Sequence, residues 1–575
     1  MAELETVWRR KTDDTLLEAA ARLHEFSDDA QRAITTEIER RKSPEYLREQ
    51  HARTAAAPAR PRGMPASVPA YTASPAWLAK RAMLAVVLMV GFYLFATTIA
   101  LVLLWLPYGE WVYIGRLHIK LAAFSVIGGL TIMWSLVPRV DRFTPPGPRL
   151  DRATHPRLFD LIQRVAAATR QEVPAEVYLL NEVNAWVTER GGVMGFGSRR
   201  VMGIGLPLMQ SVSVAEFEAI IAHEFGHYCA GDVKLGPWIY KTRAAIGRTI
   251  TGVGDTLIAA PFLWYGGHFL RLTHAISRQQ EFIADRMAAG VAGAAAMSSA
   301  LKRVSAAGQL FPAYLDQEVG PVLNAGFLPP VSAGFQEFLG SERIGVVSAQ
   351  LVADAEEAET TDPFDTHPCL RDRLAALDTV SGPNRTNAST EPAAALVGNA
   401  DAHARALLEA VAGADAIRKL KPIEWDAVGT AVYATRWREL VHQHWAWLGR
   451  FTTHTLPAGK DGFITAGTDL PGTDQESLNG DERAARAAQL LAVSVAVMLV
   501  DDGWRVHTRP GLPLTLERAA RSFDPFAAID ALANGRLSHE GWLAECEALG
   551  IAGRALGKAA PVFVPKHDAL QPLPA

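Results

Sequence analysis

Two long uncharged stretches constrain the fold of this chain more than any other feature of its sequence. The first covers residues 82–109, and its most apolar part is 82–106. As a helix rising 1.5 Å per residue, this stretch is long enough to cross a hydrocarbon core of about 30 Å. The second covers 121–138, and apolar residues from 117 onward extend it. We expect a transmembrane helical hairpin with spans at about 82–106 and 117–138. The alternative is a buried core hairpin of a soluble protein.

The flanking charges predict how this hairpin is oriented. Lys80 and Arg81 precede the first span, and four arginines lie between residues 139 and 152, after the second. The connecting loop has one Arg and one Glu and is rich in Trp and Tyr. By the positive-inside rule, the two long arms are cytoplasmic. Some 80 residues precede the first span, which does not fit a secretory signal peptide. The chain has only 3 cysteines, which suits a reducing compartment.

Composition and periodicity divide the rest of the chain. The net charge of −4 gives no reason to expect a nucleic-acid partner. We expect a mainly α fold with a small β-sheet, in this order: a small helical module at 1–50, a Pro-, Ala- and Arg-rich linker at 51–80, the hairpin at 81–140, a domain of alternating helices and strands at 150–380, a linker at 381–401 and a mostly helical C-terminal domain at 402–575.

Two further apolar segments leave alternatives open. Residues 485–500 lack the length and flanks of a span, so a buried core helix is favoured over membrane contact. Residues 249–270 are interrupted by Asp255 and several glycines. We expect them to lie at the membrane interface or to pack on the neighbouring domain; a true span is the alternative.

The motif that carries chemistry is His223-Glu224-Phe225-Gly226-His227. On a helix, positions i and i+4 share one face, so both imidazoles can bind one metal ion. Glu224 projects beside that face, where a carboxylate can accept a proton from an attacking water. A capping-box pattern at 213–216 and an apolar stripe support a helix here. The alternative is two surface histidines on an amphipathic helix.

A third ligand is expected downstream. Residues 277–289 form a helix pattern with Glu281 and Asp285 four positions apart. A carboxylate from a second helix would complete a site of two His and one Glu with an open fourth position. Asp285 would then orient a ligand imidazole. Taken alone, such an acidic pair is more typical of a solvated helix face.

Residues from about 150 to 378 resemble the HtpX-like and CAAX-prenyl-protease type of membrane zinc metallopeptidase, a gluzincin family. The matching segments occur in the family's order: HPRLFDLIQRVAAATRQEVPAEVYLL, Asn184-Ala185-Trp186, LPLMQSVSVAEFEAIIAHEFGHYCAGD, SRQQEFIAD, and Thr366-His367-Pro368 followed by Arg373. The chain departs from the family pattern at Trp186 and Val187, where small residues are common.

The resemblance implies one Zn²⁺ per chain, held by His223, His227 and Glu281, with Asp285 as neighbour. It also implies that Glu224, His367 and Arg373 are catalytic, with His367 and Arg373 near the zinc, where His367 together with Arg373 stabilises the oxyanion. The alternative for His367 is a turn residue before Pro368. Substrate binding is expected at Asn184, Ala185 and Trp186. A peptide would add as a strand to a sheet edge near residues 185–189 or 201–205.

The expected function is that of a membrane-anchored zinc metalloendopeptidase acting in membrane-protein quality control or processing. We expect it in the bacterial inner (plasma) membrane, with the lipid bilayer and protein or peptide substrates as its partners. The alternative function is a chaperone-like or scaffold protein that uses the metallopeptidase fold for binding.

Overall fold

The computed structural model describes residues 31, 35, 36, 75–137, 143–190, 199–227, 236–254, 256–357, 367–380, 389–471 and 478–557. The chain divides into two compact units, Met1–Ala70 and Tyr71–Ala575. The helical module expected at 1–50 lies almost entirely outside the described residues, as does most of the linker expected at 51–80. The second unit is predominantly helical with small sheets, as the sequence predicts.

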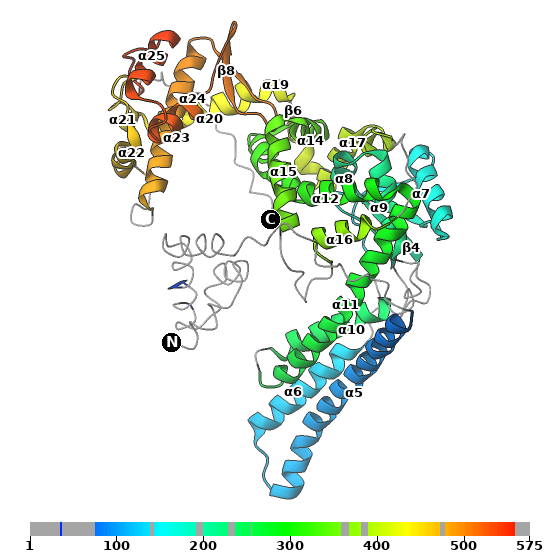
Figure 1. The fold of residues 1–575 in the computed structure, drawn as a ribbon. Helices are drawn as coiled ribbons and strands as arrows, with labels where there is room; N and C mark the ends of the chain where they lie inside the picture. The colour runs from blue at the N-terminus through cyan, green and yellow to red at the C-terminus, as the bar shows by residue number, and fades with distance from the viewer. Residues whose placement is uncertain are drawn as a thin grey trace, which may run out of the picture. The chain divides into compact units, whose positions relative to one another are not determined.

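The two apolar stretches form a helical hairpin (Figure 1). Helix α5 covers Pro75–Ile114 and helix α6 covers Ile119–Leu136. By length and composition, both are able to cross a membrane. The helices approach closely at Gly129, where an added Cβ would lie 3.0 Å from the carbonyl oxygen of Ala100. Helix α5 begins at Pro75, so the last residues of the expected linker are helical.

Two more helices pack on this hairpin (Figure 1). Helix α10 covers Gly236–Val253 and helix α11 covers Ala259–Ala292. Their buried apolar side chains share a core with those of α5 and α6. The described residues of 249–270 therefore pack on the apolar hairpin. Their expected place at the membrane interface, with a true span as the alternative, stays a prediction. Hydropathy does not reveal this arrangement, because it reports composition and not the partner surface.

A four-stranded sheet with order β1-β2-β4-β3 precedes the histidine motif. Its strands are Arg149–Leu150, Glu176–Leu180, Ala185–Arg190 and Arg199–Gly205, in chain order. Strand β4 pairs in parallel with β2 and antiparallel with β3, so residues 201–205 lie inside the sheet and the expectation of an edge there is wrong. Strand β3 lies at the edge, as expected for residues 185–189. Helices α7 (Pro156–Thr169) and α9 (Val214–Gly226) pack against each other, and α9 also contacts β3. The edge strand thus lies beside the helix that carries the motif.

Further helices before and after α9 build the surrounding core. They are α8 (Leu206–Ser211), α12 (Ala294–Tyr314), the π-helical η3 (Leu315–Val319), α13 (Gly320–Asn324), α14 (Val331–Gly340), α15 (Glu342–Glu357) and α16 (Leu370–Leu377). Strand β5 (Phe327–Leu328) pairs in parallel with β6 (Lys421–Pro422). This pairing joins residues 327–328 to residues 421–422, which lie beyond the linker expected at 381–401.

The structure describes residues 389–401 of the linker expected at 381–401. This part contributes to the domain core and is not a linker. Ala393, Ala394, Leu396 and Val397 are buried in the same core as α9. They belong to the short helix η4 (Ala393–Leu396) and the residue after it, and the chain continues through α17 (Ala400–Ala412), α18 (Ala414–Arg418) and α19 (Trp425–Val428). This first core extends to Val432. Small and polar residues had suggested a linker, but the alanines here fill tight space between helices.

A second core begins at Ala434. It is formed by η5 (Gly429–Ala434), α20 (Thr435–Gln443), α21 (Trp445–Leu448), α22 (Gly459–Thr468), α23 (Gly480–Asp501), α24 (Pro525–Ala533), α25 (His539–Leu549) and a sheet of β7 (Arg505–His507), β8 (Thr515–Arg518) and β9 (Arg521–Phe523). Helix α23 is also apolar and long enough to cross a membrane. However, 61% of its apolar window is buried, and it packs against α20, α22 and α24, as a core helix does.

Candidate metal centre

Helix α9 begins with the capping box that the sequence predicts. The Ser213 hydroxyl accepts a hydrogen bond from the Glu216 backbone N–H at 3.3 Å, and Glu216 Oε2 accepts one from the Ser213 N–H at 2.7 Å. These contacts satisfy donors that a helix N-terminus otherwise leaves unpaired. The helix continues to the motif and places both histidines on one face. The Nε2 atoms of His223 and His227 lie 3.2 Å apart.

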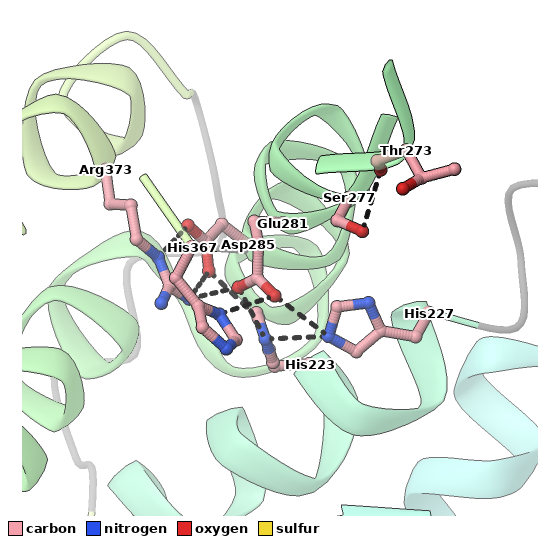
Figure 2. A network of polar contacts seen from close by, with 8 residues as sticks. All are labelled: His223, His227, Thr273, Ser277, Glu281, Asp285, His367 and Arg373. Carbon is pink, nitrogen blue, oxygen red and sulfur yellow. Dashed lines mark hydrogen bonds and ion pairs between the residues drawn. The ribbon is translucent and has the colours of Figure 1, made fainter. Parts of the chain in front are cut away.

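Helix α11 packs directly on α9 and supplies the carboxylate. Close approach depends on Gly226, because a Cβ added there would lie 2.7 Å from the Ala284 Cα. Glu281 Oε2 lies 3.4 Å from His223 Nε2, and Glu281 Oε1 lies 3.6 Å from His227 Nε2. Figure 2 shows the three side chains converging from the two helices. All three ligand atoms lie within 4.8 Å of one another.

These separations fit a zinc ion. Tetrahedral N and O ligands at about 2.0–2.2 Å from zinc lie about 3.3–3.6 Å from each other. In the site the two Nε2 atoms lie 3.2 Å apart, His223 Nε2 lies 3.4 Å from Glu281 Oε2, and His227 Nε2 lies 3.6 Å from Glu281 Oε1. The donor set of two imidazoles and one carboxylate leaves the fourth position open, as catalytic zinc sites do. The residues present therefore suit this metal in chemistry and in spacing.

Asp285 and Arg373 contact the side chains of the candidate metal ligands. His223 Nδ1 lies 2.9 Å from Asp285 Oδ1, which directs the opposite ring nitrogen toward Glu281. Arg373, on α16, donates to both oxygens of Asp285 at 2.9 and 2.7 Å, and its Nη2 lies 3.3 Å from Glu281 Oε2. His367 Nδ1 lies 2.9 Å from Glu281 Oε1 (Figure 2). The structure thus brings together the imidazoles of His223 and His227, the carboxylates of Glu281 and Asp285, and the side chains of His367 and Arg373.

Burial and these contacts shift the acid–base properties of the site. Burial alone would lower the pKa of His223, but hydrogen bonds to Asp285 and Glu281 outweigh it and raise the pKa to about 9. Burial and the nearby His223 charge lower the pKa of His227 to about 4. Burial also raises the pKa of Glu224 to about 7.

The two supporting carboxyl groups shift in the other direction. Burial would raise the pKa of Glu281, yet hydrogen bonds from His223 and His367 hold it well below its ordinary value. Hydrogen bonds from Arg373 and His223 likewise hold the pKa of Asp285 low against its burial. Both groups are therefore carboxylates, the form that binds a metal ion or orients its ligand.

The expected substrate segment lies on the neighbouring edge strand. Ala185 and Trp186 begin β3, and the carbonyl oxygen of Asn184 accepts a hydrogen bond from the Gly205 N–H at 2.8 Å. The Trp186 ring lies over the backbone of Gly203, where a Cβ would approach it to 2.4 Å. The ring therefore packs on β4, and the structure leaves the substrate-binding role of these residues as a prediction. The packing roles of Gly226 and Gly203 were not foreseen, because a glycine in a sequence does not show what approaches it.

Comparison with known proteins agrees with this geometry. Residues 152–381 match the model of peptidase family M48. This part of the chain belongs to that family. The matched residues include the edge strand, both helices that carry the candidate ligands, and α16. The M48 domain thus contains every candidate site residue named above.

Several curated relatives are named as proteases. The chain is 26% identical over 242 residues to Protease HtpX homolog 2 of Methanosarcina mazei, covering 39% of this chain and 72% of that protein. It is 27% identical over 166 residues to Protease HtpX of Idiomarina loihiensis, covering 26% and 56%. It is 24% identical over 271 residues to Protease HtpX homolog 1 of Streptomyces coelicolor, covering 42% and 77%. No solved structure gives a significant match.

Proposed function

We propose that the protein is a membrane-anchored, zinc-dependent metalloendopeptidase. The observation that carries this proposal is the spacing of the His223, His227 and Glu281 ligand atoms, which suits one tetrahedral metal ion with an open position. The M48 match and the protease names of the relatives support the same reaction class. The apolar α5–α6 hairpin is the proposed anchor.

In this proposal the chain's own residues position the reactants and move the proton. A zinc ion held by the three ligands supplies Lewis-acid activation of water and of the scissile carbonyl. Glu224 accepts the proton of the attacking water and transfers it to the leaving amine, and its pKa of about 7 suits both steps. His367 stabilises the negative charge that develops on the carbonyl oxygen. Arg373 is committed to Asp285 and Glu281, so its role is to hold the ligands in place.

The substrate is proposed to be an extended segment of a membrane protein. Strand β3 is the edge of its sheet and lies beside α9, so a peptide pairing with β3 would cross the metal centre. Main-chain pairing gives affinity with little sequence selectivity, which suits quality control or processing of many proteins. The positive-inside rule places this domain in the cytoplasm, and we propose the bacterial inner membrane as its location.

The test is the variant Glu224→Gln in the full-length protein, purified in detergent or nanodiscs. We expect zinc content near one ion per chain, as in the wild type, and cleavage of casein or a membrane-protein substrate reduced at least about 100-fold. Glu218→Gln, on the same helix, is the matched control and should cleave normally. Cleavage at the wild-type rate by Glu224→Gln would exclude the proposed base.

A chaperone-like or scaffold function is the second candidate. It is favoured by the separate core that begins at Ala434, outside the M48 match. The same variant separates the two: a binding protein would keep its cellular effect with Glu224→Gln, whereas a protease would lose it and retain bound substrates.

A further inference from the structure

A cavity of about 300 Å³ lies between α5 and α6, next to the turn that joins them. This turn is the lower end of the hairpin in Figure 1. Helix α5 contributes the rings of Trp105 and Tyr113, whose centroids lie 6.3 Å apart, and α6 contributes Leu121 and Ala122. The lining is almost entirely apolar. Its size and its aromatic walls are those of a small ligand-binding site.

The sequence of α5 makes room for this cavity. Pro107 lies inside the helix and has no N–H, so the usual hydrogen bond to the carbonyl of Leu103 is missing. Gly109 is buried, and a Cβ added there would lie 2.9 Å from two carbon atoms of the Trp105 ring. The ring therefore lies directly over the Gly109 backbone, where it forms part of the cavity wall.

Ser125 is a buried polar residue in this lining. It is 1% exposed, and its hydroxyl has no hydrogen-bond partner among the residues that the structure describes. Other hydroxyls of the hairpin donate to their own helix: Thr98 to the Leu94 carbonyl at 2.8 Å, and Ser135 to the Ile132 carbonyl at 2.7 Å. A buried hydroxyl without a partner is unfavourable among apolar groups. Whatever fills the cavity is therefore expected to supply an acceptor for Ser125.

A carboxylate lies at the turn end of the cavity. Glu110 lines it, and the Glu110 side chain is only 10% exposed. This carboxylate accepts a hydrogen bond from the His118 backbone N–H at 3.2 Å and also contacts the His118 ring. A carboxylate has about four acceptor positions, so these contacts leave positions for a ligand. His118 precedes Ser125 by seven residues, which places the hydroxyl about 10 Å farther along α6.

The side chains around the cavity point to the bilayer as the source of its ligand. Trp105, Tyr113, Ile114 and Leu121 line the cavity and are each more than half exposed. In the anchor proposed above they lie near the membrane surface, where aromatic rings are enriched. A helix of another membrane protein satisfies its own backbone carbonyls and has none free for Ser125. A lipid ester carbonyl is free to accept, so a lipid fits this site better.

We propose that the cavity binds one phospholipid whose headgroup carries a protonated amine, such as phosphatidylethanolamine. The ammonium group donates to Glu110, and an ester carbonyl that lies deeper in the membrane accepts from Ser125. Glu110 is the only acidic residue between 82 and 138, so the site favours a cationic group. The apolar walls hold the adjoining part of an acyl chain. This inference rests on the proposed α5–α6 anchor and assigns a specific lipid to it.

The experiment is native mass spectrometry of the full-length protein in detergent, titrated with one lipid at a time. The probes are phosphatidylethanolamine, phosphatidylcholine and phosphatidylglycerol with identical acyl chains. Only the first has an ammonium group that donates hydrogen bonds. We expect one phosphatidylethanolamine per chain, bound about tenfold more tightly than either other lipid, because a hydrogen bond to a charged group is lost in both.

Four variants, each checked by gel filtration, locate the site. Glu110→Gln should remove most of the preference for phosphatidylethanolamine. Ser125→Ala should weaken binding of all three lipids about three- to tenfold, because they share the ester carbonyl. Ala122→Phe fills the cavity and should abolish binding. Thr98→Val is the matched control: it removes a hydroxyl that is paired within α5 and is outside the cavity lining, so it should bind like the wild type.

Equal affinity of the wild type for the three lipids would overturn the recognition of an amine, without the need for any variant. Absence of a retained lipid, or equal binding by Ser125→Ala and Thr98→Val, would show that the cavity is not the proposed lipid site. The anchor is tested separately by alkaline extraction of membranes that contain the wild type, since release of the chain would refute the anchor itself. None of these measurements depends on zinc or on proteolytic activity.

Discussion

At the scale of single residues, Asp285 connects the ligands to the rest of the site. Its Oδ1 lies 2.9 Å from His223 Nδ1, and it accepts hydrogen bonds from two nitrogens of Arg373, so one carboxylate orients a ligand ring and neutralises a buried guanidinium. Asp285→Asn keeps the shape of the side chain and removes its charge. We expect zinc affinity to fall about 10–100-fold. Competition with a chelator of known affinity measures this change.

A nearby acid provides the control for that substitution. Asp372 lies on α16 beside Arg373, and its side chain is 45% exposed. Asp372→Asn should therefore leave zinc affinity within about twofold, because exposed ion pairs contribute little. If the two variants bound zinc equally well, the orienting role of Asp285 would be wrong.

The site was predictable from sequence where its residues lie close together in the chain. The spacing of His223 and His227, and of Glu281 and Asp285, follows from helical periodicity. The pairing of Arg373 with Asp285 spans 88 residues and requires α16 to pack against α11. No local pattern encodes such a contact, and only the family resemblance indicated that Arg373 lies near the metal.

At the scale of helices, the metal centre depends on how closely α9 and α11 approach. In Gly226→Ala, the new Cβ would meet the backbone of Ala284, which cannot move independently of α11. Forced separation of well-packed elements costs about 1–3 kcal/mol. We expect a lower melting temperature and weaker zinc binding, since Glu281 lies one turn from the contact. Calorimetry with and without zinc measures both effects.

Gly308→Ala, in α12, is the matched control for this prediction. Nothing lies within 4 Å of a Cβ added at Gly308, and the residue is in the middle of a helix. Alanine there should stabilise the protein by about 0.5–1 kcal/mol, because glycine loses more conformational freedom on folding. Equal stability of the Gly226 and Gly308 variants would show that α9 and α11 have room to adjust.

The sequence predicted best those helices whose pattern of length and hydropathy is strongest. Length and hydropathy located α5 and α6, because a membrane-length apolar run has few alternative structures. Packing of α10 and α11 on that hairpin was not foreseen. Their sequence is only moderately apolar, and the polar contact of Arg248 with the end of α6 depends on tertiary structure.

At the scale of the whole molecule, the boundary between the two cores lies later than composition indicated. Residues 393–432 complete the core around the M48 domain, and the C-terminal core begins at Ala434. The expected linker at 381–401 is rich in Ala, Asn and Pro, which is typical of loops. Alanine is also the residue that fits between closely packed helices, and sequence alone does not separate the two uses.

One half-buried acid joins these two cores and makes their contact sensitive to pH. Glu318, in η3, accepts a hydrogen bond from the Gly511 N–H at 3.1 Å. Burial raises the pKa of Glu318 above its ordinary value of 4.5, although the hydrogen bond and the Arg343 charge oppose this shift. The folded protein therefore binds a proton more tightly than the unfolded chain does. Its contribution to stability is present at low pH and is lost as pH rises through the folded pKa.

Glu318→Gln removes this dependence, because the amide oxygen still accepts from Gly511 and carries no charge. We expect the variant to melt at a higher temperature than the wild type at pH 8, with the difference shrinking toward pH 5. Thermal scans at several pH values measure it. Glu517→Gln, at an exposed position in β8, is the control and should change stability by less than about 0.5 kcal/mol at every pH. A wild type that gained stability relative to Glu318→Gln as pH rose would contradict the assigned sign, because an ionised Glu318 would then favour the folded state.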